Sequence, residues 1–178
     1  MTRLTEDMID EIPRTAGKRS ENLRQAVGMD LKTLAFRAIG EDPEKYDLSK
    51  YVTASVPITA GLGVIGGFSQ SVSAILESMG FRSFVTSRTD IDGIYEALEK
   101  EADILFTADD VRYIAYNRRT GAYFDNSFAT AAGYAEALDG AAGGLKGKNV
   151  LVVGAGLVGT DAARILTSKG ATVSITDV

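Results

Sequence analysis

Apolar residues in the middle of the chain alternate between two spacings, which predicts strands that alternate with helices. In residues 68–79 they recur every three or four positions and Gly80 follows, as expected of an amphipathic helix. A second helix has the same spacing and is marked by Ile91, Ile94, Tyr95 and Leu98. Strands are predicted over residues 51–58, 82–86 and 103–107. Strands separated by helices pair in parallel, so the predicted fold class is α/β, with an N-terminal α/β domain built on a small, largely parallel sheet.

Capping residues and helix breakers predict three helices before this sheet. Thr5 is expected to cap a helix that Pro13 ends, and a further helix is expected over residues 20–27. Asp30 is the expected N-cap of a third helix, which Gly40 terminates. The buried face of that helix is predicted to consist of Leu31, Leu34, Ala35 and Ala38.

Turn residues after the third strand predict a hairpin and then a long helix. Residues 112–117 and 122–124 are strand-like and flank a short glycine-containing turn. Ser127 is the expected cap of an Ala-rich helix that ends near Leu138. The glycine-rich residues 139–144 that follow are predicted to form a linker.

The last part of the chain has the order of a dinucleotide site: strand, glycine turn, helix, strand, acid. A buried strand is predicted over residues 147–153, a turn over Gly154–Gly159, a helix over 160–169 and a strand over 171–176 that ends in Asp177. The sequence is accordingly divided into a helical and α/β substrate domain over residues 1–139 and the start of an incomplete NAD-binding Rossmann domain over residues 145–178.

Each part of this motif has a physical role. Gly154 permits the tight turn, Gly156 lets the backbone approach a pyrophosphate, and Gly159 lets the helix pack close to the strand. The helix N-terminus offers unpaired N–H groups to the phosphates. A carboxylate at Asp177 can bond both ribose hydroxyls and would repel a 2′-phosphate, which favours NAD over NADP. The predicted cofactor-binding residues are Gly154, Gly156, Leu157, Val158, Gly159 and Asp177. The alternative is a structural turn without a ligand.

The sequence ends at Val178, directly after this acid. A doubly wound nucleotide domain has about five or six strands, whereas two are predicted here. Two strands would leave an apolar sheet edge and open faces. We therefore expect a truncated nucleotide domain, whether by processing, by cloning or in the sequence record, or less favourably one that a partner chain completes.

A second glycine-rich segment, residues 59–67, also joins a strand to a helix. The next strand supplies no carboxylate at the fingerprint spacing, which disfavours a dinucleotide. A turn of small residues before a helix can hold another anion, and the carboxylate of an amino acid fits it as a phosphate does. A tight turn of purely structural purpose is the alternative. The predicted substrate-binding residues here are Thr59, Ala60, Gly61 and Ser69.

Two adjacent acids follow the third strand, and ligands bind at the carboxyl ends of parallel strands. Asp109 could hold a substrate ammonium or accept a proton, and it is the predicted catalytic residue. Asp110 is expected either to share this role or to cap the following turn. Asn126 is a further substrate-binding candidate, with a helix cap as its alternative.

Composition limits the chemistry that the chain can carry out. It contains no Cys and no His, which excludes thiolate nucleophiles, Ser-His triads and His-ligated metals, and no metal site is expected. A bound cofactor that carries the reaction suits such a chain. Its net charge is −5 with scattered basic residues, so nucleic acid is not an expected partner. The apolar runs are too short for a membrane span and the start has no secretory signal, so a cytoplasmic protein is expected.

The order and spacing of several short motifs resemble the pyrrolysine synthase (PylD) family. The motifs are Val56–Thr59, Gly63–Gly66, Phe68–Ser69, Gly80–Phe81, Ser83–Phe84, Ala108–Asp110, Asn126 and Val150–Gly159. Relatives tend to carry Ser and Asn where this chain has Ala60 and Leu62, which removes a hydroxyl and an amide from the first glycine loop.

The resemblance implies an NAD-dependent dehydrogenase that acts on lysine carrying a 3-methyl-D-ornithyl group on its ε-nitrogen. Such an enzyme oxidises the terminal amine of the ornithine, ammonia leaves, and a pyrroline ring closes. It also implies substrate binding between an α/β domain and a Rossmann domain, with the N-terminal helix as a lid. Asp109 and water remain alternatives for the proton acceptor, and a homodimer is one open assembly state.

Two other functions remain open. An amino-acid or shikimate-type NAD-dependent dehydrogenase has the same two-domain plan and would give an open-chain keto acid instead of a cyclic imine. A non-catalytic module that binds an amino-acid-like ligand would need only the first glycine loop and would not bind NAD.

Overall fold

The computed structural model describes residues 4–177, which form two compact units. Unit 1 consists of the chain up to Arg19 together with Asp47–Asp125, and unit 2 consists of Ser20–Tyr46 and the chain from Asn126 onward. Helix α2 (Ile12–Val27) continues from one unit into the other. The domain boundary predicted between residues 139 and 145 falls inside unit 2. The division into compact units does not test that boundary, which stays a prediction.

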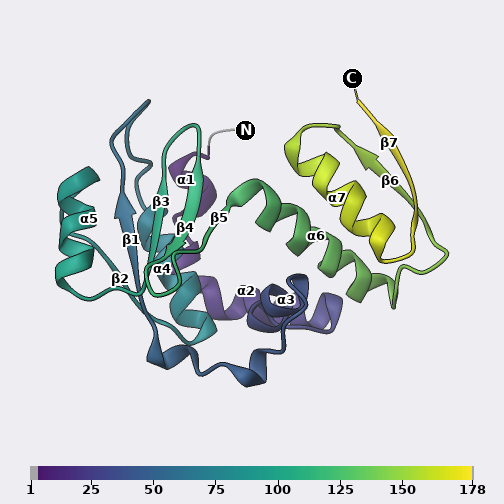
Figure 1. The fold of residues 1–178 in the computed structure, drawn as a ribbon, viewed down its shortest axis with the longest axis horizontal. Helices are drawn as coiled ribbons and strands as arrows, with labels where there is room; N and C mark the ends of the chain where they lie inside the picture. Colours follow the sequence, from purple (N-terminus) through teal and green to yellow (C-terminus); the bar gives the residue numbers. More distant parts are fainter. Residues whose placement is uncertain (1–3, 178) are drawn as a thin grey trace. The chain divides into compact units, whose positions relative to one another are not determined.

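Unit 1 is built on a five-stranded sheet in the order β2-β1-β3-β4-β5 (Figure 1). Its strands are β1 (Val52–Pro57), β2 (Arg82–Val85), β3 (Ile104–Ala108), β4 (Tyr113–Asn117) and β5 (Tyr123–Asp125). Strand β1 pairs in parallel with β2 and β3, while β4 and β5 form a hairpin that adds antiparallel to β3. The predicted α/β class and hairpin are confirmed, and the sheet is mixed because the hairpin joins it.

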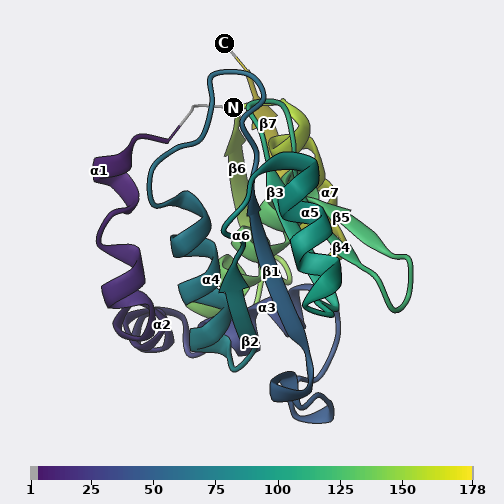
Figure 2. The same ribbon diagram turned by 90° about the vertical axis from the view of Figure 1, so that its left-hand side faces the viewer.

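Helices cover both faces of this sheet, with α4 (Phe68–Met79) on one side of β1 and α5 (Asp90–Glu99) on the other (Figure 2). Ala54, Val56 and Leu105 form the core with Ala97 of α5. A Cβ at Gly93 would lie 2.7 Å from a methyl group of Val56, so this glycine lets α5 approach the sheet closely. The remaining unit 1 helices are α1 (Glu6–Ile9) and the 3₁₀ turn η2 (Leu48–Lys50).

Of the residues that marked α5 in the sequence, Ile94 packs against the core, whereas the other three are exposed. Ile91 is 76% exposed and Tyr95 is 55% exposed. The helix instead buries Gly93, Glu96 and Ala97, because two small residues permit close packing and Glu96 bonds to the backbone beneath it. Spacing therefore located the helix but not its orientation.

Unit 2 consists of helices on a two-stranded parallel sheet. Its elements are α3 (Leu31–Ala38), the 3₁₀ turn η1 (Pro43–Lys45), α6 (Asn126–Ala142), β6 (Asn149–Val153), α7 (Leu157–Ser168) and β7 (Thr172–Thr176). Strands β6 and β7 are parallel, so β6-α7-β7 is the predicted first β-α-β unit. Ala135, Leu145, Leu166 and Ala171 form its core.

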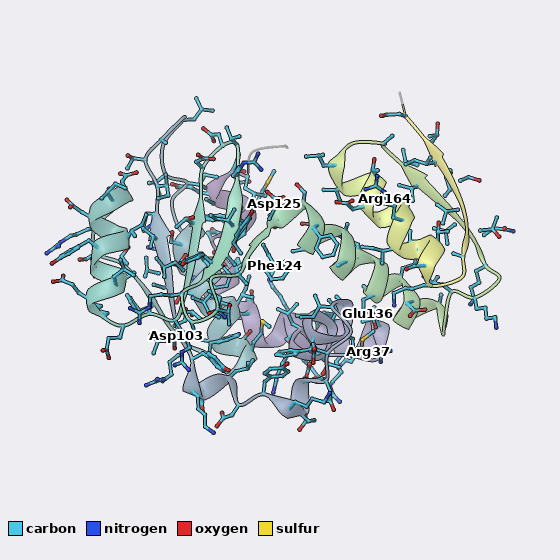
Figure 3. The ribbon with its side chains drawn as sticks, in the orientation of Figure 1. Arg37, Asp103, Phe124, Asp125, Glu136 and Arg164 are labelled. Carbon is cyan, nitrogen blue, oxygen red and sulfur yellow. The ribbon has the colours of Figure 1, made fainter. Side chains whose placement is uncertain are left out.

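A buried carboxylate joins three helices of unit 2. The Glu136 side chain on α6 is 2% exposed, and its Oε1 lies 3.0 Å from Nε of Arg37 on α3 (Figure 3). Its Oε2 lies 2.6 Å from Nζ of Lys169 at the end of α7. Lys169 also contacts Asp139, at 3.0 Å. Two cations thus compensate the cost of burying Glu136.

Predicted helix boundaries are wrong in α2 and α6, and α7 begins at Leu157 instead of residue 160. Helix α2 begins at Ile12, so Pro13 lies in its first turn, where its missing N–H would have no helical partner anyway. Helix α6 begins at Asn126 instead of being capped by Ser127, and it continues through most of the predicted linker to Ala142. A Cβ at Gly140 would lie 2.6 Å from the Val27 carbonyl oxygen, so that glycine serves close packing and not flexibility.

Caps and burial elsewhere follow the sequence in part. Asp30 accepts a hydrogen bond from the Thr33 N–H as the predicted N-cap of α3. Leu34 is buried, and its predicted companions on α3 are half-buried. The prediction of a buried β6 is wrong: Leu151 is 63% exposed and Val153 is 73% exposed, because the face of β6 opposite α7 is uncovered.

The buried Glu96 makes the stability of unit 1 depend on pH. A hydrogen bond from Lys100 Nζ and others from the Ser87 and Arg88 N–H groups lower the pKa of Glu96 from 4.5 to about 2. Because the folded-state pKa is depressed, the stabilisation is complete above pH 4.5 and is lost as the pH falls toward 2.

We expect Glu96→Gln to destabilise the protein at pH 7, and the difference from wild type to shrink at pH 3. The amide cannot accept from Lys100 and both N–H groups as the ionised carboxylate does. Urea unfolding followed by circular dichroism at both pH values measures this, with Glu77→Gln on an exposed part of α4 as the control. Equal unfolding midpoints at pH 7 would refute this role of Glu96.

Candidate functional site

The glycine turn of unit 2 has the geometry that its motif predicts. Strands β6 and β7 are in register at Val153 and Thr176, and the Gly154 N–H donates to the Thr176 carbonyl oxygen at 2.8 Å. Gly154 has φ +103°, a conformation that favours glycine. Gly156 is the N-cap of α7, and Leu157 and Val158 begin its first turn, whose N–H groups lack intrahelical partners.

The other two glycines of the turn differ in what surrounds them. A Cβ at Gly159 would collide with the Gly154 carbonyl oxygen and lie 3.5 Å from the Val152 side chain, so this glycine allows α7 to pack against β6. At Gly156 a Cβ would meet no atom within 4 Å. Space next to the backbone at Gly156 is what a bound pyrophosphate requires.

Asp177 lies at the same edge as this turn. It is exposed and directly follows β7, whose last residue pairs with the last residue of β6. Asp177 and Gly154 therefore leave adjacent parallel strands at their carboxyl ends, where α/β sheets bind ligands. These residues fit a dinucleotide: open space at the helix N-terminus for the phosphates and a carboxylate for a ribose.

The first glycine loop, in unit 1, is fixed at its start by an acid that the sequence did not reveal. Thr59 donates from its N–H and its hydroxyl to the two oxygens of Asp90, at 2.8 and 2.7 Å. The Thr59 hydroxyl bond is the main reason that the pKa of Asp90 is lowered. Thr59 thus orders the loop through Asp90, the first residue of α5.

Asp110 holds the tip of the same loop. Its Oδ2 accepts from the Leu62 N–H at 2.5 Å. Gly61, at φ +72°, lies against this carboxylate so closely that a Cβ would collide with it. Asp110 therefore positions the loop, which differs from both roles considered for it in the sequence.

Asp109 forms the turn between β3 and β4. Its Oδ1 accepts from the Arg112 and Val111 N–H groups, each at 2.7 Å, and these bonds lower the pKa of the Asp109 carboxyl. Since β1 and β3 are parallel neighbours that end at Pro57 and Ala108, the Thr59 loop and Asp109 lie at one edge of the sheet. Because the two hydrogen bonds lower its pKa, the Asp109 carboxylate is anionic at neutral pH and a weak proton acceptor.

The remaining candidates are placed differently. Ala60 is exposed at the start of the loop, whereas Ser69 is buried in the first turn of α4. Asn126 begins α6 in unit 2, and its Oδ1 accepts from the Thr130 hydroxyl at 3.4 Å. Thr59, Ala60, Gly61, Ser69 and Asp109 all belong to unit 1, whereas Asn126 belongs to unit 2.

Helix α1, expected as a lid, packs against the end of the glycine loop. The Glu6 carboxylate occupies the space where a Cβ at Gly66 would lie. The Ser71 hydroxyl on α4 donates to the Ile9 carbonyl oxygen at 3.1 Å, and Ile9 is buried. The helix is thereby fixed on α4.

Among residues 4–177, no three Asp or Glu side chains are grouped so that they could hold a metal ion. None of the helices in that range is long and apolar enough to cross a membrane.

Comparison with known proteins identifies the relatives of this sequence. The family described as the pyrrolysine biosynthesis protein PylD, N-terminal domain, matches residues 8–124. A pyrrolysine synthase of Methanosarcina acetivorans is 37% identical over 174 residues, which cover 96% of this chain and 63% of the relative. A pyrrolysine synthase of Methanosarcina barkeri is 36% identical over 173 residues, which cover 95% and 62%. The chain thus spans less than two thirds of the length of these relatives.

Alanine at Gly159 and at Gly156 should have different effects on stability. Gly159→Ala should destabilise unit 2 by about 1–3 kcal/mol, because its methyl group meets backbone. Gly156→Ala should leave stability within about 1 kcal/mol of wild type, because its φ of −68° and the open space accept alanine. Chemical denaturation of both variants checks this, and equal stability losses would contradict the packing role of Gly159.

Proposed function

This chain belongs to the family of the pyrrolysine biosynthesis protein PylD, and from that membership we propose that it is part of an NAD-dependent dehydrogenase of pyrrolysine biosynthesis. The substrate would be lysine carrying 3-methyl-D-ornithine on its ε-nitrogen. Its terminal amine would be oxidised, with loss of ammonia and closure of a pyrroline ring. The observation that carries the proposal is the turn of unit 2, which combines an open helix N-terminus at Gly156 with Asp177 on the adjacent strand.

The proposal assigns the cofactor to unit 2. The N–H groups at the start of α7 would bind the pyrophosphate, and Asp177 would accept hydrogen bonds from the ribose hydroxyls. When bound, NAD would supply the hydride acceptor for the carbon that carries the amine. The absence of His and Cys from this chain supports assigning the redox chemistry to a cofactor, because the side chains of this chain offer few acid–base groups near neutral pH.

The proposal assigns the amino-acid-derived substrate to the sheet edge of unit 1. Backbone N–H groups of the Thr59–Gly67 loop would bind a carboxylate, and the head of α4 adds its dipole. Asp109 is anionic because two N–H groups bond its Oδ1, so it suits a substrate ammonium better than proton acceptance. Water then takes the proton that the amine must lose before oxidation.

NAD binding is the first test. Isothermal titration calorimetry of the wild-type chain with NAD should give heat, and Asp177→Asn should weaken binding about 10- to 100-fold, as expected for lost charge-assisted hydrogen bonds. The same variant should lower the ratio of NAD affinity to NADP affinity. Gly156→Ala, which keeps the fold, should also weaken NAD binding. No heat with the wild type at millimolar NAD would refute the cofactor assignment and favour a non-catalytic module.

Asp109→Asn tests the substrate assignment. The asparagine oxygen can still accept from Val111 and Arg112, so the turn is retained while the charge is lost. In a full-length protein with a complete nucleotide domain, we expect turnover to fall about 10- to 100-fold with NAD affinity unchanged. Asp92→Asn, on an exposed part of α5, is the control. NADH formation measures turnover, and mass spectrometry of the product distinguishes a cyclic imine from the keto acid of an amino-acid dehydrogenase. Unchanged turnover would exclude this role.

A further inference from the structure

One residue beside the glycine loop of unit 1 has a strained backbone. Asp90, the first residue of α5, has a φ of +54°, in the left-handed region that residues with a side chain rarely adopt. Asp tolerates this region better than most residues, but the conformation still costs free energy. The first residue of a helix normally has right-handed helical backbone angles. The start of α5 therefore does not account for the strain at Asp90.

Glu101 has the same conformation for a reason that is local. Among residues 4–177, Asp90 and Glu101 are the non-glycine residues with a positive φ, and Glu101 follows the C-cap of α5 with a φ of +55°. The N–H of the next residue, Ala102, donates to the Ala97 carbonyl oxygen at 3.0 Å, as in helices that end on a left-handed residue. The strain at Glu101 thus ends the helix, and no such motif exists at Asp90.

The contact that Asp90 makes is with the start of the glycine loop. Its two carboxylate oxygens accept from the N–H and the hydroxyl of Thr59, at 2.8 and 2.7 Å, across 31 positions of sequence. Thr59 is the second residue after the end of β1 at Pro57, so these bonds fix the direction in which the loop leaves the sheet. Backbone strain of this kind persists where other contacts hold it, and it is concentrated at ligand sites.

We propose that Asp90 is a positioning residue for substrate binding, which acts through Thr59 to hold the Thr59–Gly67 loop in the conformation that receives the ligand. The identity of the ligand, an amino-acid-derived carboxylate, rests on the proposed function. A loop that is ordered before the ligand arrives loses less conformational entropy on binding. Without Asp90 the fraction of molecules with the loop in this conformation falls, and the apparent affinity falls by the same factor.

The test replaces each strained residue by glycine, which adopts a positive φ freely. Asp90→Gly relieves the strain and removes both bonds to Thr59, whereas Glu101→Gly, the matched control, relieves the strain at the other end of α5. Hydrogen–deuterium exchange of the ligand-free chain should become faster in residues 59–67 of Asp90→Gly and stay unchanged there in Glu101→Gly.

Substrate affinity is the second measurement. Calorimetry with lysine carrying the 3-methyl-D-ornithyl group should show binding about tenfold weaker in Asp90→Gly, as expected for lost hydrogen bonds to a charged group. Glu101→Gly should bind this substrate as the wild type does, and neither variant should change NAD affinity. Asp90→Asn should recover part of the affinity, because asparagine tolerates a positive φ and its amide oxygen can accept from the Thr59 N–H.

The possible results separate the role of Asp90 from the proposed function. Unchanged loop exchange or unchanged substrate affinity in Asp90→Gly would overturn the positioning role and leave the proposed function intact. An equal loss of affinity in Glu101→Gly would also overturn it, because the effect would then come from α5 as a whole. A wild type that binds NAD but not this substrate would overturn the positioning role together with the substrate assignment.

Discussion

The close approach of α7 to β6 is the contact on which the candidate cofactor site depends. It is possible because Gly159 has no side chain to meet the Gly154 carbonyl oxygen. The approach sets the start of α7 directly above the end of β6, with Asp177 one strand away. The same geometry that packs the β-α-β unit thus turns the helix N–H groups toward the place where a diphosphate would bind. The missing Gly159 side chain thus permits the packing, and the proposed anion site would depend on the same contact.

Unit 1 uses a different means to shape its glycine loop. Two carboxylates bind the loop from outside, Asp90 at Thr59 and Asp110 at Leu62. Asp109 beside them is bonded to its own turn. All three acids at this edge therefore hold backbone in place, Asp90 and Asp110 in the loop and Asp109 in its own turn. Such preorganisation lowers the entropy lost when a ligand binds.

The sequence predicted local features well and orientation less well. Periodicity and glycine stops located α4, and the dinucleotide motif located β6, α7 and β7, because these signals are local. The buried face of α5 was missed because its contacts use small residues and a hydrogen-bonded acid in place of apolar side chains. The roles of Asp90 and Asp110 were missed because each bonds a residue far away in the sequence. The predicted linker was helical because Gly140 packs against α2.

The buried Glu136 has a consequence for the order in which the chain folds. Arg37 precedes the sheet of unit 1 in the sequence, whereas Glu136 and Lys169 follow it. On the ribosome, which releases the N-terminus first, α3 therefore emerges long before its partners, and the whole sheet of unit 1 is synthesised in the interval. Unit 2 can close only by a contact between distant segments, which is the slow kind of step in folding. We therefore expect unit 1 to fold first during translation. Helix α3 can make its contacts with Glu136 only after α6 has been synthesised.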